Sequence, residues 1–262
     1  MARQCGDLRG ATVIEVGAGP GSLTRSLLEL SAKRVIAVEK DKRFLPALEF
    51  LKESSQGRLE VVHGDMLELD EAELLGRFDT DRSEWQCPLP PVRLLGNLPF
   101  GIATQLYLKW LRQIPRRQGL FAYGRVPMVL MFQKEVADRI VSPPGSKVYG
   151  RLSVMTSYAS LARSCFTIGG KAFVPPPKVD AGVVHIQPTL ASPSNPTNYD
   201  RLEHVLQCVF QQRRKQLRNS LSSLVVDVPS LLHACALDGT MRPEALPIEG
   251  WLRIVQNYQR YL

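Results

Sequence analysis

Segments rich in β-branched residues alternate with segments of helical periodicity along the first 141 residues, and this alternation constrains the fold more than any other feature. Strands that alternate with helices of about ten residues predict an α/β fold with a parallel, doubly wound sheet. Right-handed crossovers then bring the carboxyl ends of the strands to one edge, where ligands bind. The predicted strands are residues 12–16, 34–38, 59–62, 92–95 and 128–132, and the predicted helices are residues 22–30, 42–52, 103–111 and 134–141.

Two segments interrupt this rhythm. Residues 70–91 begin acidic and become proline-rich, so they are interpreted as a helix-loop insert on the surface. Residues 187–198 are rich in Pro, Ser, Thr and Asn, which favours a domain boundary. Beyond that boundary, residues 202–221 and 251–261 have helical periodicity. The expected organisation is a Rossmann-like domain over residues 1–190 and a small helical domain over residues 198–262.

Composition and charge restrict the class of partner. The chain has 262 residues, of which 44% are hydrophobic, enough for one sizeable core and a smaller module. Its net charge of +8 favours a polyanion such as nucleic acid or an anionic membrane surface. A basic surface without such a partner is the alternative. No apolar run reaches the roughly 18 residues of a transmembrane helix, so no membrane span is expected.

The cysteines and histidines predict neither a disulfide framework nor a metal site. The five cysteines are widely spaced without a C-x-x-C pair, and the four histidines are scattered. Reduced thiols are the expected state. No signal or transit peptide is visible, either because the chain has none or because it begins after one.

A glycine-rich loop, Gly17-Ala18-Gly19-Pro20-Gly21, follows the first predicted strand and opens a helix. Glycines allow a sharp turn and a close approach of ligand to backbone, and the helix N-terminus offers free N–H groups. Glu39 ends the second strand 22 residues after Gly17, where a carboxylate can bind two ribose hydroxyls. NAD enzymes share that arrangement, although the G-x-G-x-G spacing leans away from a dinucleotide.

Asp65 ends the third strand and supplies the second acidic group of the predicted cofactor site. Its carboxylate can accept a hydrogen bond from an adenine amino group, and Met66 can pack on the base. A helix N-cap or an Asx-turn is the alternative role of Asp65, and a purely structural turn is the alternative role of the glycines.

The chemistry is expected at Asn97-Leu98-Pro99-Phe100, which follows the fourth strand on the same sheet edge. An adenine N6 is a poor nucleophile because its lone pair is delocalised into the ring. The Asn97 side-chain carbonyl and the Leu98 main-chain carbonyl can accept its two N–H groups, which frees the lone pair. Phe100 can stack on a flipped base, an interaction worth about 1–3 kcal/mol. A β-turn with a core phenylalanine is the alternative.

These motifs resemble a known family, the ribosomal RNA adenine N6,N6-dimethyltransferases of the small subunit. The resemblance covers nearly the whole chain. Within the family it is strongest to the mitochondrial branch, because of Phe100 where bacterial members have Tyr, the insert before the fourth strand, and residues 38–41, 123–125 and 182–185. The stretches that carry the family resemblance are residues 13–24, 38–41, 63–65, 96–100, 132–136, 150–155, 173–180, 210–215 and 241–245.

The resemblance implies a class I methyltransferase that uses S-adenosyl-L-methionine and dimethylates two adjacent adenosines in the hairpin loop near the 3′ end of small-subunit rRNA. It also implies a location in the mitochondrial matrix. The implied partners are that rRNA or the assembling small ribosomal subunit, with the mitochondrial transcription machinery as a further candidate. The residues implied at the cofactor are Gly17, Glu39, Lys40, Asp65 and Asn97.

Two further features are expected to contact RNA. Arg213, Arg214 and Lys215 are expected within two turns of one helix, where they can grip phosphates, with a solvated helix face as the alternative. Phe173 heads a proline-rich loop that borders the target-base pocket in the family, which makes it a second stacking candidate beside its alternative role in the core.

One departure from the family keeps a rival open. Only eleven residues precede the first predicted strand, and the family's Gln-Asn-Phe-Leu motif, which closes over the cofactor and helps to bind RNA, is absent. This favours a transcription or ribosome-assembly factor with reduced or lost methyl transfer, whereas the intact Asn97 and Phe100 favour the enzyme. An NAD-dependent dehydrogenase is the second rival, and it leaves residues 97–100 unexplained.

Overall fold

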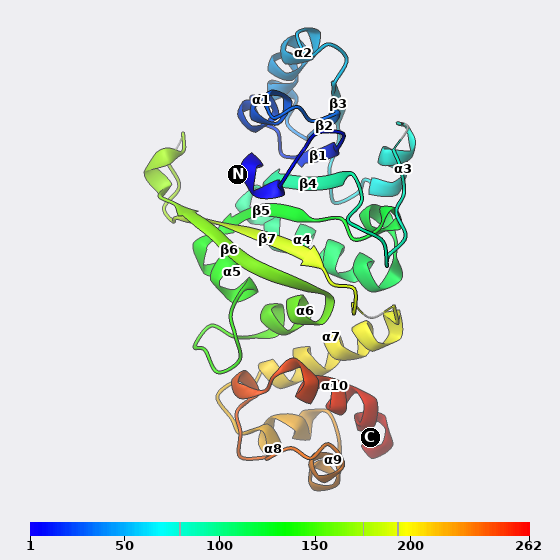
Figure 1. Cartoon of the computed structure of the whole chain (residues 1–262). Helices are drawn as coiled ribbons and strands as arrows, with labels where there is room; N and C mark the ends of the chain where they lie inside the picture. The colour runs from blue at the N-terminus through cyan, green and yellow to red at the C-terminus, as the bar shows by residue number, and fades with distance from the viewer. Residues whose placement is uncertain (79, 175, 193) are drawn as a thin grey trace. The chain divides into compact units, whose positions relative to one another are not determined.

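The strands of this chain form one mixed sheet in the computed structural model, which describes residues 1–78, 80–174, 176–192 and 194–262. The strand order in the seven-stranded sheet is β3-β2-β1-β4-β5-β7-β6 (Figure 1). The strands are β1 Thr12–Val16, β2 Arg34–Glu39, β3 Leu59–His63, β4 Val92–Asn97, β5 Met128–Gln133, β6 Ser160–Ile168 and β7 Ala181–Pro188.

Strands β1 to β5 pair in parallel, as the alternation of strands and helices predicts. Every residue of β1 is buried, and so is every residue of β2 after Arg34, because both faces of the central strands are covered. The chain leaves β1 toward β2 on one side, and β4 pairs with β1 on the other. The carboxyl end of β1 therefore lies at the point where the strand order reverses, which is where open α/β sheets bind ligands.

The helices that accompany this sheet begin and end close to their predicted bounds. They are α1 Ser22–Glu29, α2 Leu45–Glu53, α3 Glu71–Gly76, α4 Phe100–Arg116 and α5 Lys134–Ile140, and short 3-10 turns lie at η1 Ala2–Cys5, η2 Lys42–Phe44, η3 Gly119–Tyr123 and η4 Gly170–Ala172. Helix α4 is longer than predicted. Its buried side chains recur every three or four positions, as in an amphipathic helix with one face in the core: Ala103, Leu106, Tyr107, Trp110, Leu111, Ile114 and Pro115.

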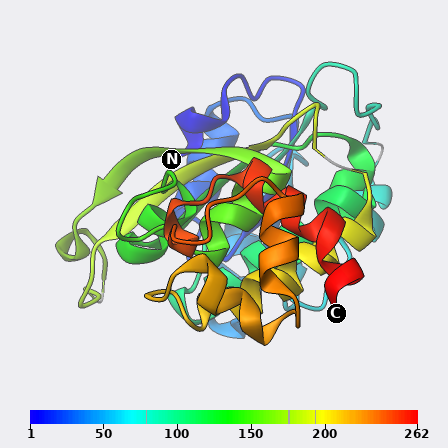
Figure 2. The same cartoon turned by 90° about the horizontal axis from the view of Figure 1, so that it is seen from below.

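The antiparallel pair β6 and β7 was not predicted, and it makes the sheet mixed rather than wholly parallel. β7 pairs antiparallel with β5 and with β6, and the register of β6 shifts between Ser164 and Phe166. Strand β6 lies at the edge of the sheet. Four of its nine residues are exposed and the other five are half-buried or buried, in no regular alternation, so no period-two pattern reveals the strand. The connection between β6 and β7 extends beyond the rest of the sheet (Figures 1 and 2).

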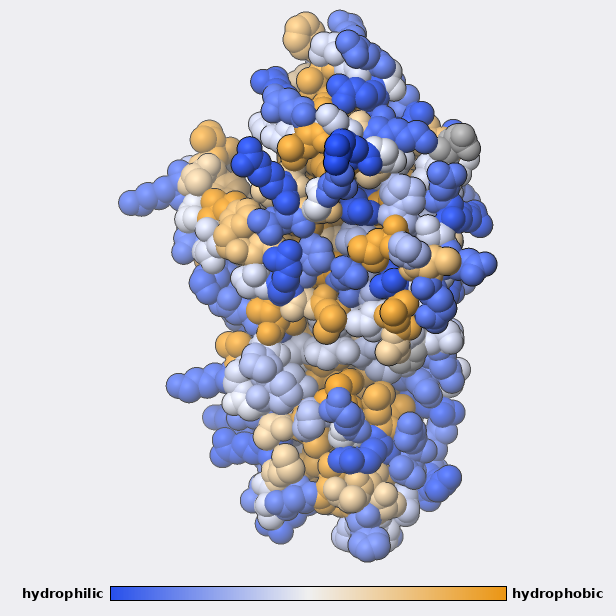
Figure 3. Space-filling view, in the orientation of Figure 1, coloured by the Kyte–Doolittle hydropathy of each residue, from blue (hydrophilic) through white to orange (hydrophobic). Residues whose placement is uncertain are grey.

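Hydrophobic side chains lie at the far end of this β6–β7 connection (Figure 3), where Val174 is 99% exposed.

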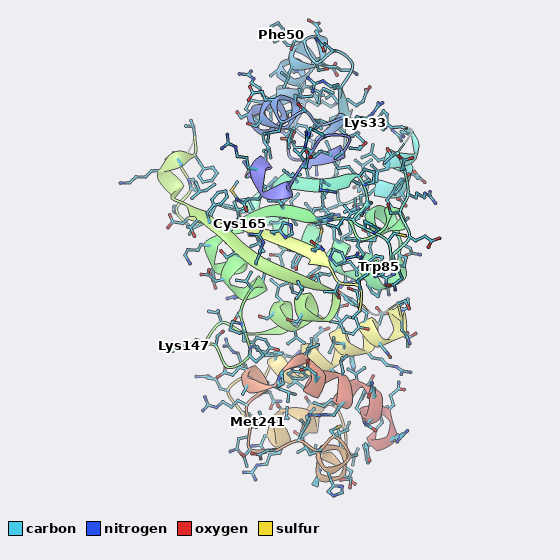
Figure 4. The ribbon with its side chains drawn as sticks, viewed as in Figure 1. Lys33, Phe50, Trp85, Lys147, Cys165 and Met241 are labelled. Carbon is cyan, nitrogen blue, oxygen red and sulfur yellow. The ribbon has the colours of Figure 1, made fainter. Side chains whose placement is uncertain are left out.

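The insert before β4 contains α3 and then a loop that is fastened to the rest of its unit. Trp85, labelled in Figure 4, donates from Nε1 to the carbonyl oxygen of Thr189 at 3.1 Å, and the Arg117 guanidinium lies 3.1 Å from the centre of its ring. Arg125 donates to the carbonyl oxygens of Trp85 and Cys87 at 2.8 and 2.9 Å. The predicted helix-loop is therefore present, and two arginines hold its loop. Asp79, within the insert, lies outside the described residues.

The chain forms two compact units. The first comprises Met1–Ala137 and Ser160–Ser192, and the second comprises Asp138–Ala159 and Pro193–Leu262. The sequence assigns residues 138–159 to the methyltransferase domain, whereas the structure groups them with the C-terminal helices. The physical reason is packing, because α6, Arg151–Ala159, lies against α7, Pro196–Phe210, with Tyr158 and Tyr199 in an edge-on ring contact at 6.0 Å.

The second unit is helical, as predicted for the C-terminal region. Asn195 caps α7 by accepting from the amides of Thr197 and Asn198, and Pro196 occupies the first turn. The predicted continuous helix over residues 202–221 is broken, because α7 ends at Phe210 and the chain turns before the next helix. The other elements are α8 Leu217–Ser220, η5 Leu221–Ser223, α9 Val228–Ala234, η6 Pro243–Ala245, α10 Ile248–Asn257 and η7 Tyr258–Tyr261.

Candidate active site

The glycine loop and the turn after β4 meet at the carboxyl edge of the sheet. Gly17 has a φ of +72°, and a Cβ atom there would lie 3.1 Å from the main-chain oxygen of Asn97. A side chain at this position would be strained and crowded, so only glycine allows this close approach. Gly19 also has a positive φ, of +55°. The contact brings the two predicted halves of the site together.

Glu39, the last residue of β2, is fixed beside the glycine loop. Its side chain is 7% exposed. One carboxylate oxygen accepts from the amide of Gly19 at 2.8 Å, and the other accepts from the amide of Asp41 at 2.7 Å. A carboxylate oxygen accepts about two hydrogen bonds, so each oxygen keeps capacity for a hydroxyl group.

Asp65 and Lys40 form an ion pair on the other side of a small pocket. The Asp65 carboxylate lies 2.6 Å from the Lys40 ammonium and also accepts from the amide of Leu67 at 2.9 Å. The hydrogen bond from Lys40, followed by that from Leu67, lowers the pKa of Asp65 and keeps it ionised. Lys40 is 72% exposed and lines the pocket as the ion-pair partner of Asp65.

One pocket joins most of the predicted cofactor residues. Gly17, Glu39, Lys40 and Asp65 line it together with Pro99. The other lining side chains are apolar, and they are Val16, Val38, Met66 and Ile102. The apolar walls suit a base, one carboxylate suits ribose hydroxyls and the other suits an amino group, so the pocket fits an adenosine. Two predicted cofactor residues, Gly19 in the glycine loop and Asn97 at the end of β4, do not line this pocket.

The loop that carries Asp65 and Met66 is held from behind by a buried polar network. Lys109 of α4 donates to the carbonyl oxygens of Met66 and Leu69 at 2.8 and 2.6 Å and lies 3.0 Å from the Glu71 carboxylate. Glu71 is fully buried and also accepts from Trp110 and Gln113, at 2.8 and 2.9 Å. This network was not predicted from the sequence, because α4 and the loop that it supports are about 40 residues apart in the chain.

The turn after β4 presents the polar side chain of Asn97 to solvent. Asn97 is exposed, whereas Leu98 is 1% exposed and fills the space beside Gly96. The Pro99 carbonyl oxygen accepts from the amides of Ile102 and Ala103 at 3.1 Å and so starts α4. Within the described residues, neither the Asn97 side chain nor the Leu98 carbonyl oxygen has a hydrogen-bond partner. The exposed Asn97 side chain is free to accept from an amino group, whereas the unpaired Leu98 carbonyl oxygen belongs to a buried residue.

The two stacking candidates are half-buried. Phe100 and Phe173 both pack against the core cluster of the first unit, which includes Met131 and Val183. Each therefore has a packing role and an exposed part. The proline-rich loop after Phe173 includes Pro175, which lies outside the described residues.

The three basic residues expected to contact RNA lie in the second unit, and their predicted helical setting is wrong. Arg213, Arg214 and Lys215 occupy the turn between α7 and α8. Arg213 lies 3.0 Å from the Glu244 carboxylate and donates to the Lys147 carbonyl oxygen, so it fastens this turn. Arg214 and Lys215 are exposed.

Glu15 is a further acidic residue near the site that the sequence analysis missed. It lies inside β1, is 1% exposed, and faces Thr24. Burial raises the pKa of Glu15 to about 8; neighbouring Thr24 opposes this rise, and the charge of Glu39 adds to it. The signal available in the sequence was an acidic residue within an otherwise apolar strand.

The described residues contain no group of three or more His, Cys, Asp or Glu side chains that could hold a metal ion. Among them, no helix is both long and apolar enough to cross a membrane.

The sheet order and a site at its reversal point define a class I, Rossmann-like methyltransferase fold. A dimethyladenosine transferase from Plasmodium falciparum has this fold with a TM-score of 0.77, at 21% identity, over 99% of this chain and 94% of its own. The 23S rRNA methyltransferase ErmE has a TM-score of 0.66, at 23% identity, over 98% and 95% of the two chains.

The chain belongs to the ribosomal RNA adenine dimethylase family, whose model matches residues 8–260. A relative named mitochondrial dimethyladenosine transferase 1, from Vermamoeba vermiformis, is 39% identical over 100% of this chain and 86% of its own length. The human protein of that name is 41% identical over 99% and 76%. Ribosomal RNA small subunit methyltransferase A of Xanthobacter autotrophicus is 45% identical over 98% and 83%. The predicted family and its mitochondrial branch are confirmed, and the dehydrogenase rival is wrong.

Proposed function

We propose that this protein transfers methyl groups from S-adenosyl-L-methionine to the N6 atoms of two adjacent adenosines in the 3′-terminal hairpin loop of small-subunit rRNA. Each adenosine receives two methyl groups. The observation that carries the proposal is the close approach of Gly17 to Asn97, because it sets a nucleoside-binding pocket beside two unpaired acceptors. Family membership supports the choice of rRNA adenine as substrate.

The pocket residues are suited to hold the adenosine part of the cofactor. Glu39 has acceptor capacity for the ribose hydroxyls, and Asp65 is ionised and can accept from the adenine amino group. Met66 and Ile102 offer apolar contact to the base. When bound, the cofactor supplies an electrophilic methyl group on a sulfonium.

The turn after β4 is suited to orient the target base. The Asn97 side-chain carbonyl and the Leu98 main-chain carbonyl accept the two N6 hydrogens, which turns the nitrogen lone pair toward the methyl carbon. A bound cofactor would give up its methyl carbon to this lone pair as the carbon–sulfur bond breaks, and the nitrogen would lose one proton to water for each methyl group gained. Neither amide carbonyl is basic enough to keep that proton, so these groups act mainly by positioning.

Phe100 and Phe173 are the proposed stacking surfaces for the flipped adenine. Both are partly exposed aromatic side chains of the first unit. Stacking of about 1–3 kcal/mol per base offsets the few kcal/mol needed to unstack the adenine. Arg214 and Lys215 of the second unit are proposed to contact RNA phosphates, while Arg213 serves chiefly its ion pair with Glu244.

The proposed location is the mitochondrial matrix, supported by relatives that are about 40% identical and named as mitochondrial. The proposed partner is small-subunit rRNA or the assembling small subunit. Association with the mitochondrial transcription machinery stays a prediction. The unpaired acceptors at Asn97 and Leu98 favour the enzyme over a factor that has lost methyl transfer.

The test is transfer of a labelled methyl group to an rRNA hairpin, followed by nucleoside analysis. The purified protein is expected to form N6,N6-dimethyladenosine, and a hairpin with guanosines at the two target positions should stay unlabelled. RNA binding without any methylated adenosine would contradict the proposal. For location, a C-terminally tagged chain found outside mitochondria would contradict that part alone.

A further inference from the structure

A second pocket, of about 380 Å³, opens on the sheet of the first unit away from the methyl-transfer site. Four basic side chains and, among the described residues, no aspartate or glutamate line it. The basic residues are Arg3, Arg93, Arg163 and His185. None of these four residues takes part in the methyl transfer proposed above, so the methyl-transfer site does not explain why they are grouped.

Strand register explains why three of these residues share one face of the sheet. Arg163 of β6 is paired with His185 of β7, and His185 is paired with Val129 of β5. Val129 is in turn paired with Leu95 of β4, two positions after Arg93. Paired residues and residues two apart in a strand project to the same face. Residues more than 90 positions apart therefore converge there only through the tertiary fold.

The positive charges in this pocket have no carboxylate in direct contact among the described residues, and the charge of Asp7 acts on Arg93 only at a distance. Within the described residues, none of the three arginines forms an ion pair with a carboxylate. Arg93 donates to the neutral carbonyl oxygens of Cys5, Pro90 and Val92, at 3.2, 2.6 and 2.8 Å. Among the described residues, the Arg163 side chain donates one hydrogen bond, to the sulfur of Cys165 at 3.7 Å, a residue labelled in Figure 4.

Burial and the positive charge of the pocket shift the pKa values of two of its groups, His185 and Arg93. Burial, followed by the charges of Arg163 and Arg93, lowers the pKa of His185, so this imidazole is neutral near pH 7. Burial also lowers the pKa of Arg93. An anion in the pocket would relieve this repulsion, which makes the pocket selective for negative charge.

We propose that this basic pocket, formed by Arg3, Arg93, Arg163 and His185, binds a phosphate group of the RNA backbone outside the methyl-transfer site. Guanidinium groups bind phosphate through paired N–H donors, and phosphate contacts fix the register of a nucleic acid on a protein. Arg93 precedes Asn97 by four residues in β4, which is about 13 Å at the rise of a strand. One RNA can therefore place its target base at Asn97 and a backbone phosphate in this pocket. The choice of RNA rests on the proposed function.

The test compares RNA affinity across salt concentrations for Arg163→Gln in the full chain, with the small-subunit rRNA hairpin as probe. Removal of one phosphate contact is expected to weaken binding about five- to tenfold and to reduce the slope of log affinity against log salt by about 0.7–0.9. Arg163→Lys should keep most of that slope because it keeps the charge. Arg25→Gln is the matched control, since Arg25 is an exposed arginine of α1 outside the pocket lining.

A second measurement follows the imidazole resonances of His185, assigned by their loss in His185→Gln. They are expected to move when the hairpin is added, and less so in Arg163→Gln. Unchanged affinity and slope in Arg163→Gln would overturn the proposal, and so would a response of His185 to inorganic phosphate but not to RNA, which would define a free-anion site. Methyl transfer by the unaltered protein is measured on the same RNA, so failure of the proposed function is seen separately.

Discussion

The two sides of the candidate active site differ in how fully their polar groups are paired. On the nucleoside side, Glu39, Asp65 and Glu71 each accept hydrogen bonds from two or more groups of the protein. On the β4 side, Asn97 is exposed and has no hydrogen-bond partner within the described residues. The paired side is organised in advance for a ligand of constant shape, whereas the open side acquires its partners only when a base arrives. This division predicts that substitutions on the two sides affect different measured constants.

The largest effect is expected on the open side. Asn97→Ala should lower kcat for methyl transfer about 10²–10³-fold, the usual loss when one preorganised hydrogen-bonding group is removed from a reacting centre. The Kd for the cofactor should change much less, because Asn97 lies outside the pocket lining. Single-turnover transfer and calorimetry measure the two quantities, with Asn219→Ala, an exposed asparagine of α8, as control. Equal losses in both would mean that Asn97 serves the cofactor alone.

On the paired side, Lys109→Met should act on cofactor binding and stability and leave kcat at saturating cofactor almost unchanged. It removes the support of the Met66 and Leu69 carbonyls and leaves the buried Glu71 without its cation. We expect a loss of about 2–3 kcal/mol in the free energy of unfolding and about a tenfold higher Kd. Chemical denaturation and calorimetry measure these changes.

The matched variant for this network is Lys109→Met combined with Glu71→Gln, which removes the stranded charge. It should recover part of the lost stability but not the cofactor affinity, because the loop carbonyls stay unsupported. A fall in kcat alone, with normal cofactor binding, would show that the two sides are not separable in this way.

Gly17 lies where the two sides meet, so Gly17→Ala should affect both. The positive φ and the 3.1 Å approach to the Asn97 oxygen predict a cost of about 1–2 kcal/mol in stability, together with weaker cofactor binding and slower transfer. Gly101→Ala in α4 is the control, because a Cβ there meets no atom within 4 Å. Thermal unfolding and the kinetic assays together test this prediction, and equal behaviour of the two variants would contradict it.

The last effect appears only when the pH is varied, and it concerns Glu15 of β1, the strand that leads into the glycine loop. Its pKa of about 8 in the folded protein exceeds the ordinary value of 4.5 for a glutamate, so the native state keeps a proton that the unfolded chain releases. Stability should therefore fall as the pH rises from about 4.5 to 8, by up to about 1.4 kcal/mol per pH unit for this group. Glu15→Gln should flatten that dependence in denaturation measured from pH 5 to 8. An unchanged slope would mean that Glu15 is ionised in the folded state.

The sequence located the five parallel strands because each is a short β-branched run bounded by a turn or a helix. It also identified the glycine loop, Glu39, Asp65 and the turn at Asn97, since these residues follow strands whose carboxyl ends must share one edge. It missed β6, whose mixture of exposed and half-buried residues has no regular period, and α6, whose partner α7 begins 37 residues later. It also placed Arg213 on a helix, because a basic run has the same composition in a helix and in a turn.

By itself, the sequence determined the class of fold, the family and the edge of the sheet that carries the chemistry, because periodicity and strand-end motifs are local properties. Only the tertiary structure decided which polar groups are paired. The bond from Lys109 to the loop after Asp65, the burial of Glu15 and the convergence of Arg93, Arg163 and His185 all depend on strand order and register. The pairing of charges depends on distances across the fold, and those distances follow from packing rather than from neighbouring residues in the chain.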